Sequence, residues 1–181
     1  MNILRKKQIF VLLSVVTAPL VGAVSAHAAS TALTLTVISG TPPNALSISA
    51  PSSLSLGTNV SFPSTYTTVF NTAVTVSDER LSTPTTVGWT ATASVSDLTP
   101  TTGPVIPASV FSYAPGSITK NYGSGTLLGF SPTVLNSTAT VVTASSVTAY
   151  VGASWLPTLT LTEPNAPATG SYTGTITHSV F

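Results

Sequence analysis

The feature that most constrains this chain is an alternation, in short runs, of apolar side chains with threonine or serine. Between residues 158 and 162, for example, Leu159 and Leu161 alternate with three threonines. Successive side chains of a β-strand point to opposite faces of the sheet, so each run has one apolar face and one hydroxyl-bearing face. No stretch after the N-terminal segment keeps the 3.6-residue period of a helix. The pattern predicts strands that are buried on one face.

The stretch from residue 149 to the C-terminus contains two such runs. The second places Tyr172, Ile176 and Val180 on the face opposite its threonines. Residues 163–170, between the runs, include two prolines, an asparagine and a glycine. These residues favour turns, and proline has no N–H to donate to a ladder. We therefore predict that the two runs form a hairpin that closes the fold.

Short strands separated by proline- and glycine-containing turns recur along the chain, about eight to ten of them after the N-terminal segment. This arrangement predicts an all-β fold, an antiparallel β-sandwich of the immunoglobulin-like or Greek-key type. Residues 29–181 fit a single domain. The sequence contains no cysteine, so the domain depends on its own hydrophobic core for stability.

The first 28 residues are typical of a secretory signal peptide. A basic group at residues 5–7 precedes an apolar run that ends in an A-x-A site at residues 26–28. The apolar run is short for a transmembrane helix, and no stop-transfer cluster follows it. We predict a secreted protein that is cleaved after Ala28 and has no membrane span in the mature chain.

Removal of that segment leaves few charges. Two basic residues, Arg80 and Lys120, remain against four acidic ones. Nucleic acids and anionic membranes are bound by clusters of Lys and Arg, so neither is a predicted partner. A sparsely charged surface has little repulsion between molecules, which favours association with a wall, with other surface proteins or with further copies of the chain.

Residues suited to catalysis or metal binding are also few. His178 is the one histidine after residue 28, and no nucleophile motif accompanies it. A Ser-His-acid triad needs a base within hydrogen-bond reach of a nucleophile, so we predict a structural histidine and no enzymatic activity. Asp78, Glu79 and Asp97 could offer oxygens to calcium, but they form no D-x-D-x-D loop. No metal or other cofactor is predicted.

Two tryptophans are candidates either for the core or for a ligand surface. Trp89 shares a strand face with Ala91 and Ala93, and Trp155 begins the run that leads to Leu159. A buried indole contributes a large apolar area and needs an acceptor for its N–H. The consistent apolar face of both strands favours burial. The alternative is a surface on which the exposed rings stack against a glycan.

Several segments together resemble a known family. They are VTVSDER at 74–80, GWTATASVSDL at 88–98, IPASVFSYAPG at 106–116 and the C-terminal stretch 149–180. In an exported chain without cysteine, they resemble the WxL-type cell-surface domain of Gram-positive bacteria, from about residue 46 onward. The resemblance implies a β-rich domain with two tryptophan-centred motifs that is held non-covalently on the bacterial surface through peptidoglycan.

The resemblance also implies a function and a set of site residues. We expect a structural or adhesive protein of the cell wall that binds peptidoglycan or another wall polymer. The candidate ligand-binding residues are Trp89, Trp155, Asp78, Arg80 and Tyr150, and Asp78 and Arg80 are expected to form a local ion pair. The alternative function is a self-assembling surface coat or pilus-like subunit whose exposed sheet edges pair between copies.

Overall fold

The computed structural model describes residues 29–35, 46–57, 64–80, 87–148, 150–163 and 167–181. The predicted signal peptide, residues 1–28, lies outside the described residues. The described part of the chain consists of 15 strands and one short 3-10 helix, η1 (Ala108–Val110), so the all-β prediction is confirmed. Within that part, no helix has the length and apolar character needed to cross a membrane.

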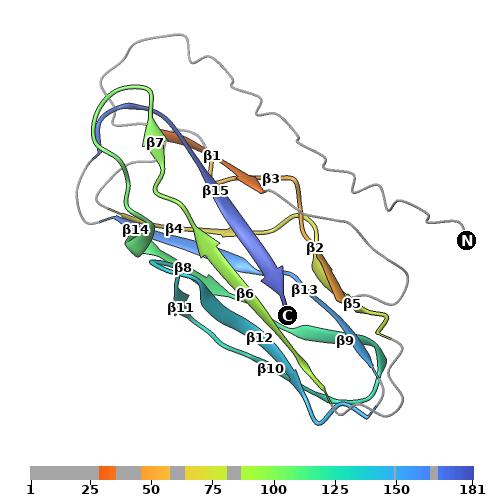
Figure 1. The fold of residues 1–181 in the computed structure, drawn as a ribbon. Coiled ribbons are helices and arrows are strands. Elements are labelled where there is room, and N and C mark those ends of the chain that lie inside the picture. The colour runs from red at the N-terminus through yellow and green to blue at the C-terminus, as the bar shows by residue number, and fades with distance from the viewer. Residues whose placement is uncertain (1–28, 36–45, 58–63, 81–86, 149, 164–166) are drawn as a thin grey trace, which may run out of the picture.

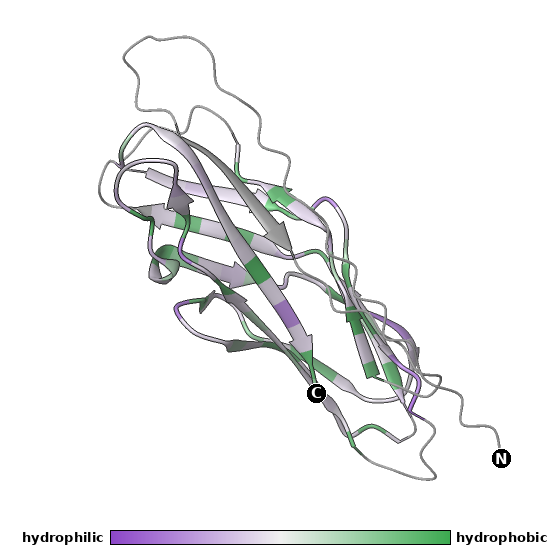
Figure 2. Cartoon of the chain, turned by 45° about the horizontal axis from the view of Figure 1, so that its top comes forward, coloured by the Kyte–Doolittle hydropathy of each residue, from purple (hydrophilic) through white to green (hydrophobic). Residues whose placement is uncertain are grey.

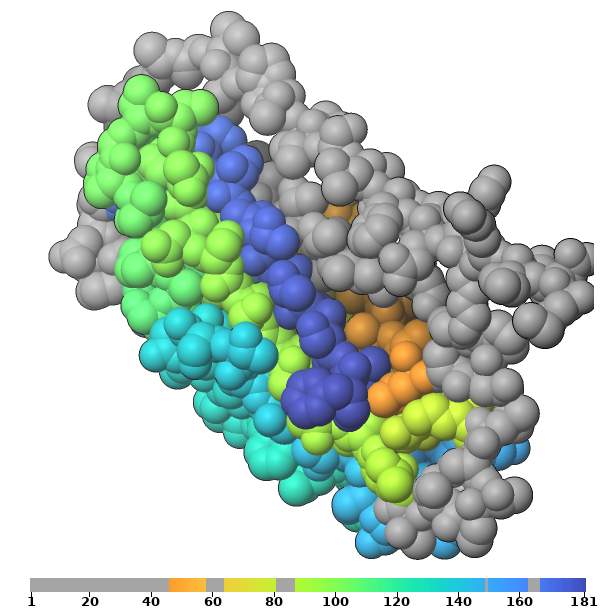
Figure 3. Space-filling model, in the orientation of Figure 1, coloured from red at the N-terminus to blue at the C-terminus, as the bar shows by residue number. Residues whose placement is uncertain are grey.

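One layer of the sandwich is a 7-stranded sheet (Figure 1). Its strands, in spatial order, are β10 (Thr126–Gly129), β12 (Ala139–Ser145), β6 (Trp89–Val95), β15 (Gly170–Val180), β1 (Ala29–Leu35) and β3 (Ser53–Ser55), with β7 (Thr99–Pro100) also paired to β15. β1 runs parallel to β15. On the other side of β1, β3 is antiparallel to it, and on the other side of β15, β6 is antiparallel to it. Figure 3 shows β15 crossing this face of the molecule beside β6.

The second layer consists of two four-stranded sheets with matching strand order. One contains β11 (Thr133–Val134), β8 (Phe111–Ala114), β14 (Thr158–Glu163) and β4 (Ser64–Val69); the other contains β9 (Ile118–Gly123), β13 (Val151–Trp155), β5 (Val74–Asp78) and β2 (Leu46–Ser49). After a few residues, β8 leads into β9, β13 into β14 and β4 into β5. Pro115 and Pro157 lie at two of these breaks, where a residue without an N–H interrupts the ladder. The layer is therefore one sheet bent into two halves.

The predicted hairpin between the last two runs is wrong. β14 pairs with β8 and β4 in the second layer, whereas β15 pairs with β6 and β1 in the first. The alternation inside each strand is as predicted, because Leu159, Leu161, Tyr172 and Ile176 are all buried. β14 and β15 thus belong to different layers. A two-residue pattern determines which face of a strand is buried, but it does not determine which strand lies alongside.

The core lies between the two layers. Its largest fully buried side chains include Trp155, Tyr113, Tyr172, Phe111 and Leu98. Figure 2 shows strands that are mostly pale, with separate hydrophobic segments and few strongly hydrophilic ones. This colouring reflects the threonines, serines and glycines that alternate with the core residues. Aromatic and aliphatic burial, which contributes about 25 cal/mol per Å² of apolar surface, takes the place of disulfides as the stabilising term.

Candidate functional site

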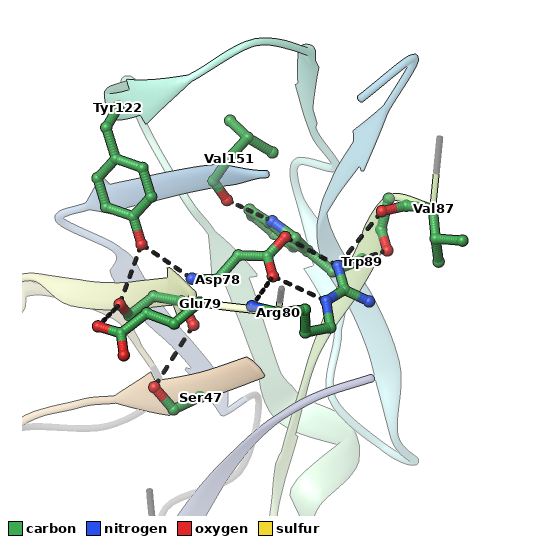
Figure 4. A network of polar contacts seen from close by, with 10 residues as sticks. Ser47, Asp78, Glu79, Arg80, Val87, Trp89, Tyr122 and Val151 are labelled. Atoms are coloured by element: carbon green, nitrogen blue, oxygen red, sulfur yellow. Dashed lines mark hydrogen bonds and ion pairs between the residues drawn. The ribbon is translucent and has the colours of Figure 1, made fainter. Parts of the chain in front are cut away.

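Asp78 and Arg80 form an ion pair at the end of β5 (Figure 4). Arg80 Nε donates to Asp78 Oδ1 at 2.7 Å and Nη2 donates to Oδ2 at 2.8 Å. This two-bond arrangement is a strong and geometrically specific form of contact between arginine and a carboxylate. The predicted ion pair is therefore present, but the Asp78 side chain is only 1% exposed. Removal of Arg80 would leave a buried carboxylate without its main partner.

The environment of Asp78 keeps its carboxylate ionised. Burial alone would raise the pKa of this group, but the hydrogen bonds and charge of Arg80, together with a backbone hydrogen bond from Val151, outweigh burial and lower the pKa from 3.8. The same ion pair raises the pKa of Arg80. Both side chains are therefore charged at neutral pH.

The ion pair also fixes the beginning of β6. Arg80 Nη2 lies 3.3 Å from the carbonyl oxygen of Val87 and 3.1 Å from that of Gly88. The next residue, Trp89, donates its indole N–H to the carbonyl oxygen of Val151 at 2.8 Å. The Val151 carbonyl oxygen thus links β13 to the beginning of β6. We call Asp78, Arg80, Trp89 and Val151 the motif cluster; it joins the end of β5 and the beginning of β6 to β13, which is more than 60 residues further along the chain.

Tyr122 of β9 lies against the outer side of the motif cluster (Figure 4). Its Oη accepts the backbone N–H of Asp78 at 2.9 Å and lies 3.0 Å from Ser77 Oγ. Ser77 Oγ in turn donates to Glu79 Oε1 at 3.4 Å. Tyr122 was not among the predicted site residues, because β9 lacks the regular alternation of the other strands. The one available signal was an aromatic residue in a stretch otherwise rich in glycine, serine and threonine.

Tyr150 lies beside Tyr122 at the surface. The two ring centroids are 5.8 Å apart and the ring planes are inclined by 59°. Tyr150 is 45% exposed and Tyr122 is 36% exposed. Among the five predicted site residues, Tyr150 is the only one classed as exposed. We call Tyr122 and Tyr150 the tyrosine pair.

Trp155 belongs to a different network in the core. It lies four residues beyond Val151 on β13, which is about 13 Å along a strand. Its indole N–H donates to Tyr113 Oη at 2.8 Å, and this oxygen lies 3.0 Å from His178 Nε2. The structure therefore separates Trp155 from the other four predicted residues.

Both tryptophan rings are buried, each with 2% of its surface exposed. Each indole N–H has an acceptor, Val151 O for Trp89 and Tyr113 Oη for Trp155. These are the properties expected of core residues. Neither ring presents a face on which a sugar could stack.

His178 is also buried, and it packs edge-on against Phe70 and Tyr113. Because Tyr113 Oη accepts from Trp155, its own proton is best donated to His178 Nε2, which places the imidazole proton on Nδ1. The reverse arrangement would leave both the phenol proton and Nδ1 unpaired. Nδ1 has no hydrogen-bond partner among the described residues. Burial lowers the pKa of His178 to about 4 and raises the pKa of Tyr113.

The acidic residues considered for calcium are not gathered in one place. Asp97 Oδ1 accepts the backbone N–H of Ala108 at 2.8 Å, beyond the far end of β6 from the motif cluster. Asp78 is occupied by Arg80. In the described ranges, no three His, Cys, Asp or Glu side chains form a group that could hold a metal ion.

Comparison of the chain with protein-family models, curated proteins and solved structures found no match. The motif cluster, the tyrosine pair and the surface around them are therefore the features that bear on function.

Proposed function

We propose that this protein is an exported, non-enzymatic β-sandwich that binds the peptidoglycan of a bacterial cell wall without covalent linkage. One observation carries the proposal. Three of the four segments that resemble WxL-type domains, 74–80, 88–98 and the beginning of 149–180, are joined by hydrogen bonds in the motif cluster, whereas Trp155 of the last segment lies in the core network with Tyr113 of the fourth. A chance resemblance between separate segments would not require them to be joined by hydrogen bonds in the fold.

The outer surface of the sheet next to the motif cluster suits such a ligand. Ser47 pairs with Ser77 across β2 and β5, and Thr75 pairs with Ser154 across β5 and β13. These outward-facing positions carry hydroxyl groups, which can exchange hydrogen bonds with the hydroxyl and amide groups of a polysaccharide. The surface needs no dense charge for this kind of recognition.

Sedimentation with purified peptidoglycan tests the proposal. The purified protein, at a concentration where it does not pellet alone, should move to the pellet when peptidoglycan is added and should be released by excess soluble wall fragments. Heat-denatured protein provides the control for non-specific adsorption. Protein that remains in the supernatant over the whole range of peptidoglycan concentration would overturn the proposal.

A second candidate function is self-assembly into a surface coat or fibre, and the edge strand β10 favours it. β10 is the last strand of the 7-stranded sheet, it contains no charged residue, and Leu128 within it is 54% exposed. Natural edge strands are commonly protected by charge. If copies pair through β10, the protein should form large particles in light scattering without peptidoglycan, and Leu128→Lys should abolish them. A monodisperse monomer at high concentration would exclude this function.

A further inference from the structure

We propose that the tyrosine pair, Tyr122 and Tyr150, is the glycan-binding surface of this protein, and that its ligand is an uncharged chain of N-acetylated sugars. This inference rests on the proposed function, because it names the part of peptidoglycan that is bound and the residues that contact it. It replaces the two tryptophans, whose rings are buried, with two tyrosines whose rings are exposed.

The position of the Tyr122 ring depends on a glycine in the neighbouring strand. Gly152 is the register partner of Tyr122 in the pairing of β13 with β9. A Cβ atom at Gly152 would lie 2.4 Å from Cε1 and Cζ of the Tyr122 ring, closer than real Cβ contacts. The ring therefore lies across the backbone of β13, with one face against the strand. The residue as a whole is 36% exposed, so part of the Tyr122 ring is accessible to a ligand.

The hydroxyl group of Tyr122 holds the far end of the ring. It accepts from the Asp78 N–H at 2.9 Å and pairs with Ser77 Oγ at 3.0 Å. Because Ser77 Oγ donates to Glu79, the phenol proton is donated to Ser77. A ring fixed before the ligand arrives loses little conformational entropy on binding. Tyr122 thus provides a preorganised apolar face.

Tyr150 supplies the second side of the site. Its ring is inclined by 59° to that of Tyr122, with 5.8 Å between centroids, so the two exposed rings present differently oriented apolar surfaces side by side. The C–H groups of a pyranose ring can pack on one aromatic face while an acetamido methyl group contacts the other. Tyrosine suits this role, since its ring is apolar and its hydroxyl is polar. Tyr150 directly precedes Val151, whose carbonyl oxygen accepts the indole N–H of Trp89.

Polar groups that fit a sugar chain surround the rings. Ser154 Oγ donates to Asn121 Oδ1 at 3.0 Å on the outer surface beside Tyr122, which leaves the Asn121 amide N–H groups to donate elsewhere. Lys120 Nζ donates a hydrogen bond to the carbonyl oxygen of Gly125 at 2.7 Å. The nearby acid is Glu79, which accepts from Ser77. One amine and one carboxylate beside several hydroxyl groups favour a neutral ligand over a polyanion such as a wall phosphate polymer.

Binding measurements on variants test this inference with two probes, insoluble peptidoglycan and a soluble N-acetylglucosamine hexamer. Tyr150→Ala should weaken binding of both by about tenfold or more, as expected for a central aromatic contact. Tyr150→Phe keeps the ring and should bind within about threefold of the unaltered protein. Gly152→Ala should also weaken binding because it displaces the Tyr122 ring. Phe130→Ala removes a comparably exposed aromatic residue outside the site, 39% exposed, and should leave binding unchanged.

The outcomes separate this inference from the proposed function. If the unaltered protein binds peptidoglycan and Tyr150→Ala binds equally well, the proposal of wall binding stands, but the assignment of the tyrosine pair as the binding surface is overturned. If the unaltered protein does not bind peptidoglycan, the proposed function fails, and the hexamer decides the inference. Hexamer binding that Tyr150→Ala abolishes would support the tyrosine pair, and absence of hexamer binding would overturn it. Melting temperatures of all variants identify any loss that is due to unfolding. If Tyr150→Ala is unfolded, a folded Gly152→Ala that binds as well as the unaltered protein overturns the assignment of the tyrosine pair.

Discussion

Acidification from pH 6.5 to pH 4 should destabilise this protein through His178. In the folded state the imidazole is buried against Phe70 and Tyr113, and its pKa is lowered from 6.5 to about 4. In the unfolded chain the same group has its ordinary pKa. Between the two values the unfolded state binds a proton that the folded state does not, so the free energy of unfolding falls as the pH falls.

The magnitude follows from the two pKa values. Each pH unit between them is equivalent to about 1.4 kcal/mol, so the whole interval corresponds to about 3 kcal/mol. This is a large part of the roughly 5–15 kcal/mol by which domains are stable. Asp78 acts in a lower pH range. Because its pKa in the folded state is lowered, its contribution to the free energy of unfolding is fully present above the ordinary pKa of 3.8 and is lost as the pH falls below that value. The two effects therefore occupy different pH windows.

Urea unfolding followed by tryptophan fluorescence at a series of pH values measures this effect. From pH 7.5 to 4.5, the unaltered protein should lose about 2–3 kcal/mol of unfolding free energy. The control is His178→Gln, whose amide can still accept a hydrogen bond from Tyr113 but does not titrate. Its stability at neutral pH can differ, but its dependence on pH over this range should be much weaker. Equal pH dependence in both proteins, or a flat profile for the unaltered protein, would refute the burial argument.

Three further substitutions test the buried networks by urea unfolding. Trp155→Ala should cost about 3–5 kcal/mol because it opens a cavity in the core, and a cost below about 1 kcal/mol would contradict that packing. Trp89→Phe keeps most of the apolar area but leaves the carbonyl oxygen of Val151 without its donor, so a loss of about 1–2 kcal/mol is expected, and no loss would argue against that hydrogen bond. Asp78→Asn should cost about 2 kcal/mol by weakening the contact with Arg80. That loss should persist at about 1 M salt, where exposed ion pairs are screened, and disappearance of the loss at high salt would place the pair at the surface.

The burial pattern of individual strands could be predicted from local sequence. In β6, Trp89, Ala91, Ala93 and Val95 are all buried, as their alternation with polar residues indicated. His178 lies two residues after Ile176 on β15 and so shares its inner face, where it is 7% exposed. These predictions succeed because side-chain direction in a strand repeats every two residues and depends on nothing beyond the strand itself.

The arrangement of the candidate site was only partly predictable. Asp78, Arg80 and Tyr150 were selected from sequence; Asp78 and Arg80 belong to the motif cluster, and Tyr150 directly precedes its member Val151. Tyr122 was missed, because its role depends on the pairing of β9 with β13 and on the absence of a side chain at Gly152. Neither condition can be seen in the segment that contains Tyr122.

The sequence by itself determined that this chain forms short strands with one apolar and one hydroxyl-bearing face, and that very few charges remain after residue 28. The tertiary structure decided which strands are neighbours. It placed β14 and β15 in different sheets, and it placed the Tyr122 hydroxyl where it accepts the backbone N–H of Asp78. It also decided that both indole rings are inside, where each N–H finds an acceptor on a distant segment. The reason is physical: alternation is a local property of the chain, whereas strand pairing and hydrogen bonding of buried groups join residues that are far apart in sequence.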